Sequence, residues 1–392
     1  MWQPWLVIRV VRYITLPRIS LVDVALSLLI FVSLTPLLGP VSRYSFIVIL
    51  CFFLNKCRIS RRSIIFKMEF LLPFILLFIL SLAVIPIYGL PVNYWVFLLT
   101  FILIIFLSIS VLDAIGLDKI LKVNFYFVSG LTLLSMPIFI LYRLGIIDAG
   151  TFLSYQYGPY ISKTIIFLNI HQYLDGTYSG RFVGFGSEPG LTQVSWLLGL
   201  YYGLKKKLNR SLVLSLVAAI ILGRSPIGVI FATFILTSYF INNWQLYVFL
   251  TLSVFITAVL SLDLLFLIDN LGLIKLTESY FSLRFERDII IFHEYMDYIF
   301  PGGIYQKYNV LIMDDFLGFG GVSQLIQRFG LFFSISFLLL VLAKRMSLKN
   351  GTIVVFLFAS LATQSLFLNP LFYLFWYGVL YYEIGLFRVP RI

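Results

Sequence analysis

Hydrophobic side chains fill this chain in long runs, and polar residues are confined mainly to the connections between them. Runs of about 16 to 22 apolar residues are long enough to cross a bilayer as helices. Candidate spans, a few of them shorter, lie at residues 21–38, 43–55, 68–88, 92–112, 122–142, 190–204, 211–223, 226–241, 245–268, 324–343, 352–369 and 371–387. The pattern predicts an all-α polytopic membrane protein with about 12 transmembrane helices and a single transmembrane domain over 1–392.

Composition excludes a soluble protein. The chain is 61% hydrophobic and 12% charged, with a mean hydropathy of +1.01, and no globular core could bury so much apolar surface. The net charge of +12 sits in short loops between apolar runs, which is typical of membrane topology and not of a nucleic-acid interface. Cys51 and Cys57 flank one span end and form neither a disulfide framework nor a metal site.

Basic residues collect in every second connection, as the positive-inside rule requires. The groups are Arg9/Arg12/Arg18, Lys56/Arg58/Arg61/Arg62/Lys67, Lys119/Lys122, Lys205/Lys206/Lys207/Arg210, Lys344/Arg345/Lys349 and Arg388/Arg391. This alternation predicts that both termini are cytoplasmic. It places two long loops, 143–189 and 269–323, on the opposite face. Loops held by a rigid scaffold often carry the functional residues.

Both loops are rich in tyrosine, including Tyr178 in the first and Tyr295 in the second. Aromatic faces stack on sugar rings, which makes these two residues candidates for binding a glycan. Tyrosines at membrane interfaces are also common as belt residues, and this alternative stays open.

The first loop ends in GTYSGRFVGFGSEPG, residues 176–190. Arg181 presents a fork of donors that suits phosphate oxygens, and Gly184 and Gly186 allow a backbone to approach a diphosphate closely. The alternative for Arg181 is an arginine reaching lipid headgroups. Glu188 precedes Pro189, so it either favours the next helix N-terminus or accepts the proton of an attacking hydroxyl.

The second loop contains a helical pattern that begins at Ser282, a suitable N-cap. Arg284 and Arg287 fall near its first turn, and His293 follows further along it. The histidine titrates in a range useful for acid–base chemistry, although a surface histidine is often structural. Asp314 and Asp315 are adjacent and point apart, with no further ligand nearby at suitable spacing, so no metal and no cofactor are expected.

Four motifs occur in a recognisable order: RFVGFGSEPG entering a span, ILGRSPIG at 221–228, SLRFERD from Ser282, and GGVSQLIQRFGLFFSISFLLL at 320–340. Together they resemble the bacterial O-antigen polymerase and O-antigen ligase superfamily. The resemblance runs from about Gly176 to the end of the tenth span. The ligase branch carries a His-Asn pair where Phe319 and Gly320 stand here, and this difference favours the polymerase branch.

The resemblance implies a metal-independent glycosyltransferase of the GT-C-like kind, acting at the periplasmic face of the bacterial inner membrane. Its substrate would be an undecaprenyl-diphosphate-linked glycan held among membrane lipids, with a chain-length regulator as a possible protein partner. Arg181, Arg224 and Arg284 match the family's arginines, although Arg224 precedes Ser225 where the family order is reversed. Transfer to lipid A core by a ligase, and transport by a flippase, are the alternatives.

Overall fold

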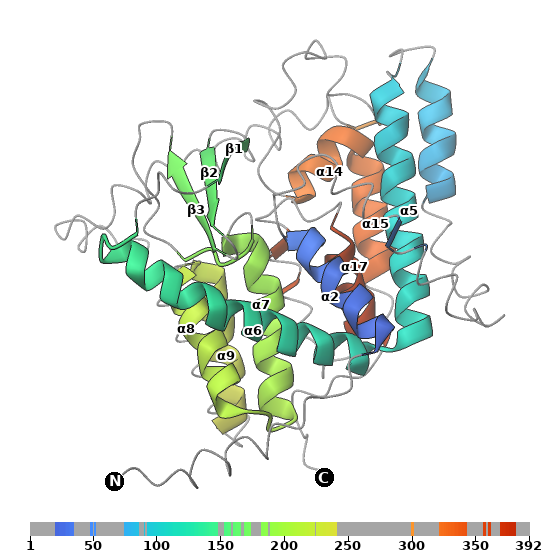
Figure 1. Ribbon diagram of the computed structural model, residues 1–392. Coiled ribbons are helices and arrows are strands. Elements are labelled where there is room, and N and C mark those ends of the chain that lie inside the picture. The colour runs from blue at the N-terminus through green and yellow to red at the C-terminus, as the bar shows by residue number, and fades with distance from the viewer. Residues whose placement is uncertain are drawn as a thin grey trace, which may run out of the picture.

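A computed structural model of the 392-residue chain shows a mainly helical protein with one small sheet (Figure 1). It describes residues 20–34, 48–49, 51, 74–85, 90, 92–147, 153–157, 160–165, 168–173, 182–186, 189–223, 225–240, 299–301, 321–342, 356–357, 360–361 and 369–381. The predicted spans 43–55, 245–268 and 352–369 lie largely or wholly outside these residues. So does the helix predicted from Ser282.

The helices follow the predicted apolar runs closely. They are α2 (Leu21–Leu34), α5 (Val92–Ile115), α6 (Leu117–Arg143), α7 (Pro189–Lys205), α8 (Arg210–Gly223), α9 (Pro226–Phe240), α14 (Gly321–Phe329), α15 (Leu331–Leu342) and α17 (Pro370–Tyr381). A further apolar helix covers Phe74–Ile85. Two helices are long and apolar enough to cross a membrane by length and composition, over Tyr94–Ile115 in α5 and Leu117–Arg143 in α6.

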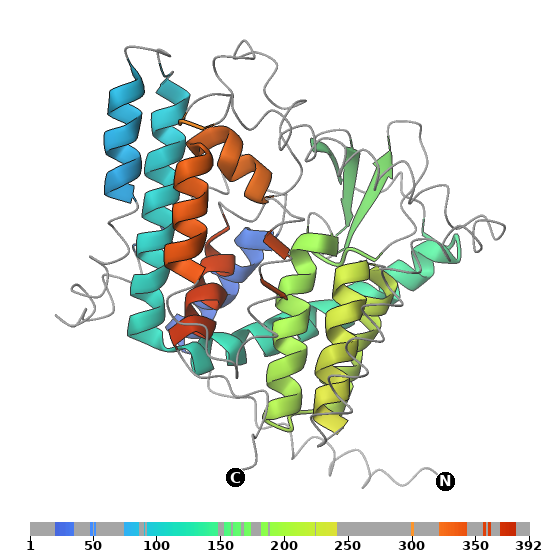
Figure 2. The same cartoon turned by 180° about the vertical axis from the view of Figure 1, so that it is seen from behind.

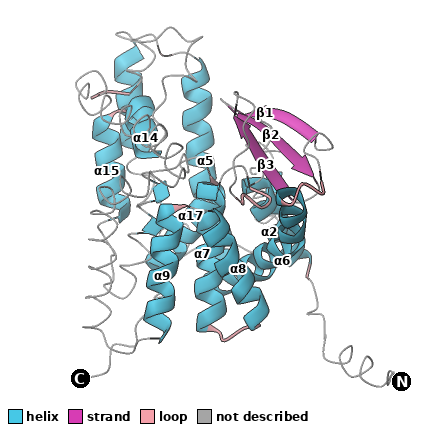
Figure 3. Ribbon diagram, turned by 90° about the vertical axis from the view of Figure 1, so that its left-hand side faces the viewer, coloured by secondary structure: helices cyan, strands magenta, loops and turns pink. Residues whose placement is uncertain are grey.

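Helix α7 lies at the centre of one half of the molecule. It packs against α6, α8 and α9, while α5 packs against α17 in the other half (Figures 1 and 3). The side chains of α7 from Thr192 to Tyr202 are buried almost without interruption. A helix buried on all sides reads as a nearly continuous apolar run, as the sequence of α7 does.

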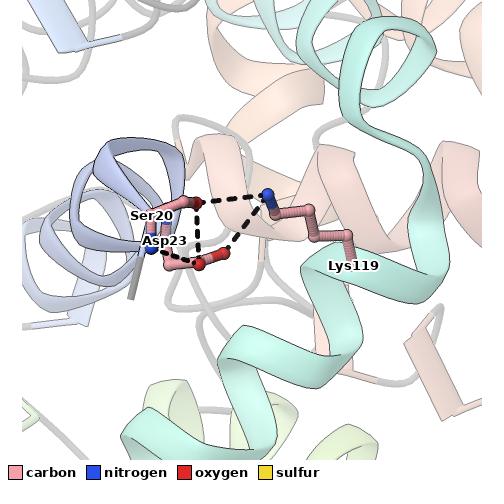
Figure 4. Close-up of polar contacts among 3 residues, drawn as sticks. All are labelled: Ser20, Asp23 and Lys119. Carbon is pink, nitrogen blue, oxygen red and sulfur yellow. Dashed lines mark hydrogen bonds and ion pairs between the residues drawn. The ribbon is translucent and has the colours of Figure 1, made fainter. Parts of the chain in front are cut away.

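Charged residues tie three helix ends together at one end of the molecule. Ser20 and Asp23 cap α2 reciprocally, with the Ser20 N–H donating to Asp23 Oδ2 at 2.8 Å and the Asp23 N–H to Ser20 Oγ at 3.2 Å. Lys119 Nζ lies 3.4 Å from Asp23 Oδ1 (Figure 4). Lys206 Nζ lies 2.8 Å from Asp118 Oδ1. The start of α2, the start of α6 and the end of α7, which the charge alternation assigns to one membrane face, therefore lie together.

The loop at 143–189 contains strands, so the prediction of an all-α fold is wrong in this loop. Strands β1 (Leu153–Tyr157), β2 (Tyr160–Ile165) and β3 (Leu168–Tyr173) form an antiparallel sheet in sequence order. The β1–β2 hairpin pairs Tyr157 with Tyr160 across Gly158-Pro159, a dipeptide that marks turns. Strands this short give little periodicity, whereas their aromatic and β-branched residues and this turn were usable signals.

The prediction of one continuous helix over 324–343 is wrong, because the helix is interrupted at Gly330. Gly330 has φ of +85°, a left-handed conformation that ends α14 and lets α15 start in a new direction. Its N–H still donates to the Ile326 carbonyl at 2.9 Å, as in a helix C-terminal cap.

Gly203 lies at a close contact of α7 with α6 and α8. A methyl group there would lie 2.5 Å from Phe125 Cε2 of α6 and 3.0 Å from Val213 Cγ2 of α8. We expect Gly203→Ala to destabilise the protein by roughly 1 to 3 kcal/mol through overpacking, measured as a lower Tm of the purified chain. Gly130→Ala in α6 is the matched control, since no described atom lies within 4 Å of its added methyl. Equal Tm values for the two variants would contradict the close α6–α7–α8 packing.

Candidate functional site

Most of the predicted site residues lie outside the part of the chain that the structure describes. Gly184 and Gly186 are described, in a turn over 182–186 that joins the sheet to α7. The remaining candidates lie outside the described residues: Tyr178, Arg181, Glu188, Arg224, Arg284, Arg287, His293 and Tyr295. Their roles stay predictions, and the described residues that flank them define the geometry of this region.

Asn169 of β3 holds the 182–186 turn to the sheet. Its side-chain Nδ2 donates to the Phe185 and Gly186 carbonyls, both at 2.8 Å, and its backbone N–H donates to the Gly184 carbonyl at 2.6 Å. Thr164 Oγ1 donates to Asn169 Oδ1. Asn169 is 1% exposed, and with all side-chain polar atoms paired it fixes the turn in one position.

The turn also rests directly on the helices below it. The Phe182 N–H donates to the Leu222 carbonyl in the last turn of α8 at 3.0 Å. The Phe182 ring stacks on Trp196 of α7, with centroids 5.8 Å apart and planes inclined by 13°, and meets Phe139 of α6 edge to face. The turn is therefore joined to three helices and to the sheet.

Both glycines of the turn lie so close to α7 that a side chain at either position would contact it. Gly184 has φ of +64°, and a methyl group there would lie 3.3 Å from Trp196 Cζ2. A methyl group on Gly186 would overlap the Thr192 side chain. Close approach to α7 is thus a structural reason for glycine at both positions, and their predicted contact with a diphosphate remains a prediction.

Two helix N-termini meet beside this turn. Helices α7 and α9 run in the same direction and pack against each other, α8 runs in the opposite direction beside them, and the strand β3 lies close to the upper end of α7 (Figure 2). Ser225 occupies the N-cap position of α9, where its carbonyl accepts from the Val229 N–H at 2.9 Å. Gln193 of α7 reaches Gly228 in the first turn of α9, with its Oε1 2.8 Å from where a methyl group on Gly228 would lie.

Sequence reasoning missed Asn169, Gln193 and Trp196. Thr192, Gln193 and Ser195 are polar residues inside an apolar run and are at most 1% exposed. Polar side chains within a predicted span are often functional, so the string TQVSW carried a usable signal. Asn169 gave none, because its role depends on pairing with a turn fifteen residues away.

Arg328 at the end of α14 is a second feature that the sequence left undefined. It is 8% exposed, and its guanidinium carbon lies 4.0 Å from the ring centroid of Phe97 in α5. Such a cation–π contact favours arginine over lysine.

Among the described residues, no three His, Cys, Asp or Glu side chains are grouped closely enough to hold a metal ion. The polar side chains described around the turn include the carboxamides of Asn169 and Gln193 and the indole of Trp196, which are uncharged. Comparisons of the chain with family models, curated proteins and solved structures gave no match.

Proposed function

We propose that this chain is a bacterial inner-membrane polysaccharide polymerase that joins undecaprenyl-diphosphate-linked oligosaccharide repeat units on the periplasmic face. In this proposal arginines stabilise the diphosphate leaving group without a metal. The motifs from Arg181 to Gly330 suggest the enzyme class, and the turn and helix ends described above support it. A chain-length regulator is the protein partner that we expect.

The hydrogen bond from the Phe182 N–H to the Leu222 carbonyl is the observation that carries the proposal. Arg181 immediately precedes Phe182, and Arg224 is two residues beyond Leu222. Two predicted phosphate-binding residues, 43 positions apart in sequence, therefore lie next to or near described residues that are hydrogen-bonded to each other.

The proposed reaction forms one glycosidic bond and breaks one. A hydroxyl of the incoming glycan attacks the anomeric carbon, and its proton passes to Glu188 or His293 as general base. The bond from that carbon to the diphosphate oxygen breaks, and undecaprenyl diphosphate leaves with the electron pair. Arginines hydrogen-bonded to that oxygen stabilise its growing charge, and loss of one preorganised donor typically costs roughly 3 to 4 kcal/mol of barrier.

Arg181→Lys and Arg284→Lys test the role of the guanidinium groups. Lysine keeps the charge and loses the bidentate fork, so we expect each variant to lower the polymerisation rate roughly 100- to 1,000-fold. The measurement is ladder formation by the purified variant on a lipid-linked repeat unit. Arg210→Lys, at an exposed helix start on the opposite end of α8, is the control that should keep full activity. Full activity of both test variants would contradict phosphate binding by these arginines.

A further inference from the structure

The carboxamide of Gln193 is a deeply buried polar group with unused hydrogen-bonding capacity. Gln193 is 1% exposed, and neither Nε2 nor Oε1 has a hydrogen-bond partner among the described residues. Most buried side-chain polar atoms in native proteins form hydrogen bonds, so a buried amide in which neither atom forms one is unusual and needs an explanation. A ligand that supplies the partner is one such explanation.

The position of this carboxamide indicates what kind of ligand would fit. Helical side chains lean toward the N-terminus of their own helix, so Gln193 reaches back toward the first turn of α7. Its contact with Gly228 places it against the first turn of α9 as well. The first N–H groups of a helix have no acceptor within that helix, and the N-terminal end of the dipole favours negative charge.

Trp196 adds a second unused donor on the same side of α7. It lies three residues after Gln193, the spacing that puts two side chains on one helix face. Trp196 is 1% exposed, and its Nε1 has no hydrogen-bond partner in the described part of the chain. An indole N–H only donates. Donors from two side chains and two helix ends match an anion with several oxygen atoms.

We infer that Gln193 and Trp196, with the first turns of α7 and α9, bind the phosphate oxygens of the lipid-linked diphosphate. This inference rests on the proposed function and extends it, because it assigns neutral donors to a group that the arginines alone were expected to hold. Gly228 is part of the site, since a side chain at that position would displace the Gln193 carboxamide.

Gln193→Met is the informative variant, because methionine keeps the length of the side chain and removes the amide. Removing an unpaired buried amide is expected to raise the Tm of the ligand-free protein. Loss of a hydrogen bond to a charged group is expected to weaken binding roughly ten- to hundredfold. A rise in stability together with a loss of affinity is a combination that a purely structural role would not produce.

Ser195→Ala is the matched control on the same helix. Ser195 is fully buried, its Oγ also has no hydrogen-bond partner among the described residues, and its carbonyl accepts from Asn124 Nδ2 of α6 at 2.9 Å. Two residues along a helix do not share a face, so Ser195 lies away from Gln193. We expect this variant to leave affinity unchanged.

The experiment measures binding of two probes to the full-length purified chain: inorganic pyrophosphate in detergent, and undecaprenyl diphosphate in phosphatidylcholine nanodiscs. Wild type and Ser195→Ala should bind both, and Gln193→Met should bind both more weakly. Gly228→Ala should also bind them more weakly, because the methyl moves the carboxamide. Equal affinities for wild type and Gln193→Met, or no binding by wild type, would overturn the inference.

A third arm replaces part of the phosphatidylcholine by phosphatidylglycerol without undecaprenyl diphosphate. A Gln193-dependent stabilisation of equal size there would identify a lipid headgroup as the ligand and overturn the assignment to the substrate. Different results would refute the inference and the proposed function. Gln193-dependent binding without polymerisation removes only the function, and polymerisation unaffected by Gln193→Met removes only the inference.

Discussion

Asn169→Asp is expected to release the 182–186 turn and to abolish activity. The aspartate can still accept from Thr164, but its other oxygen would face the carbonyls of Phe185 and Gly186, which now accept from Asn169 Nδ2. Two buried carbonyls lose their donor and meet an acceptor, at a cost of roughly 3 to 6 kcal/mol. That is a large share of the roughly 5 to 15 kcal/mol by which a typical domain is stable.

This result would be measured as the Tm of the purified chain and as hydrogen exchange of the backbone N–H groups in the turn. Asn209→Asp is the control, because exposed Asn209 accepts from the Ser211 N–H through Oδ1 and aspartate caps a helix equally well. A Tm and an exchange pattern matching wild type in Asn169→Asp would show that the turn is not held by Asn169.

Gly330→Ala is expected to have the second largest effect. The added methyl would lie 2.7 Å from the Phe300 carbonyl carbon, 2.8 Å from the Ile299 carbonyl oxygen and 2.9 Å from the Pro301 nitrogen. These are backbone atoms that cannot rotate away. Overpacking of roughly 1 to 3 kcal/mol adds to roughly 1 to 2 kcal/mol for a left-handed alanine.

Gly145→Ala separates these two contributions. Gly145 has φ of +71°, and no described atom lies within 4 Å of its added methyl, so this variant should show the backbone cost alone. The measurement is the difference in Tm between the two variants under the same conditions. Equal losses would contradict the packing of residues 299–301 on the break between α14 and α15.

Hydrophobic patterning predicted the described helices well where helix ends carry their own signals. The span predicted at 226–241 is α9, Pro226–Phe240, because proline at the first helical position and a polar Asn242-Asn243 end are visible in sequence. Patterning failed at Gly330, because a single glycine does not interrupt an apolar run although its backbone conformation ends a helix. It failed again at 153–173, where short strands leave too few residues for a period to show.

Only part of the candidate site could be predicted, because sequence shows which residues are present but not which distant residues they contact. The glycines of the 182–186 turn are visible as residues, whereas the atoms they make room for belong to Trp196 and Thr192, further along the chain. The hydrogen bond between Phe182 and Leu222 and the van der Waals contact of Gln193 with Gly228 arise when α7, α8 and α9 pack. Local sequence carries no information about such contacts, so they could not be predicted from it.

The proposed activity, formation of glycosidic bonds between lipid-linked repeat units, can be measured with purified components. The purified full-length chain is incubated in nanodiscs with an undecaprenyl-diphosphate-linked repeat unit, without a nucleotide sugar and with a metal chelator. A ladder of products that grow by one repeat unit, with release of undecaprenyl diphosphate, is the predicted result. Movement of the substrate across the bilayer with no new glycosidic bond would contradict the claim.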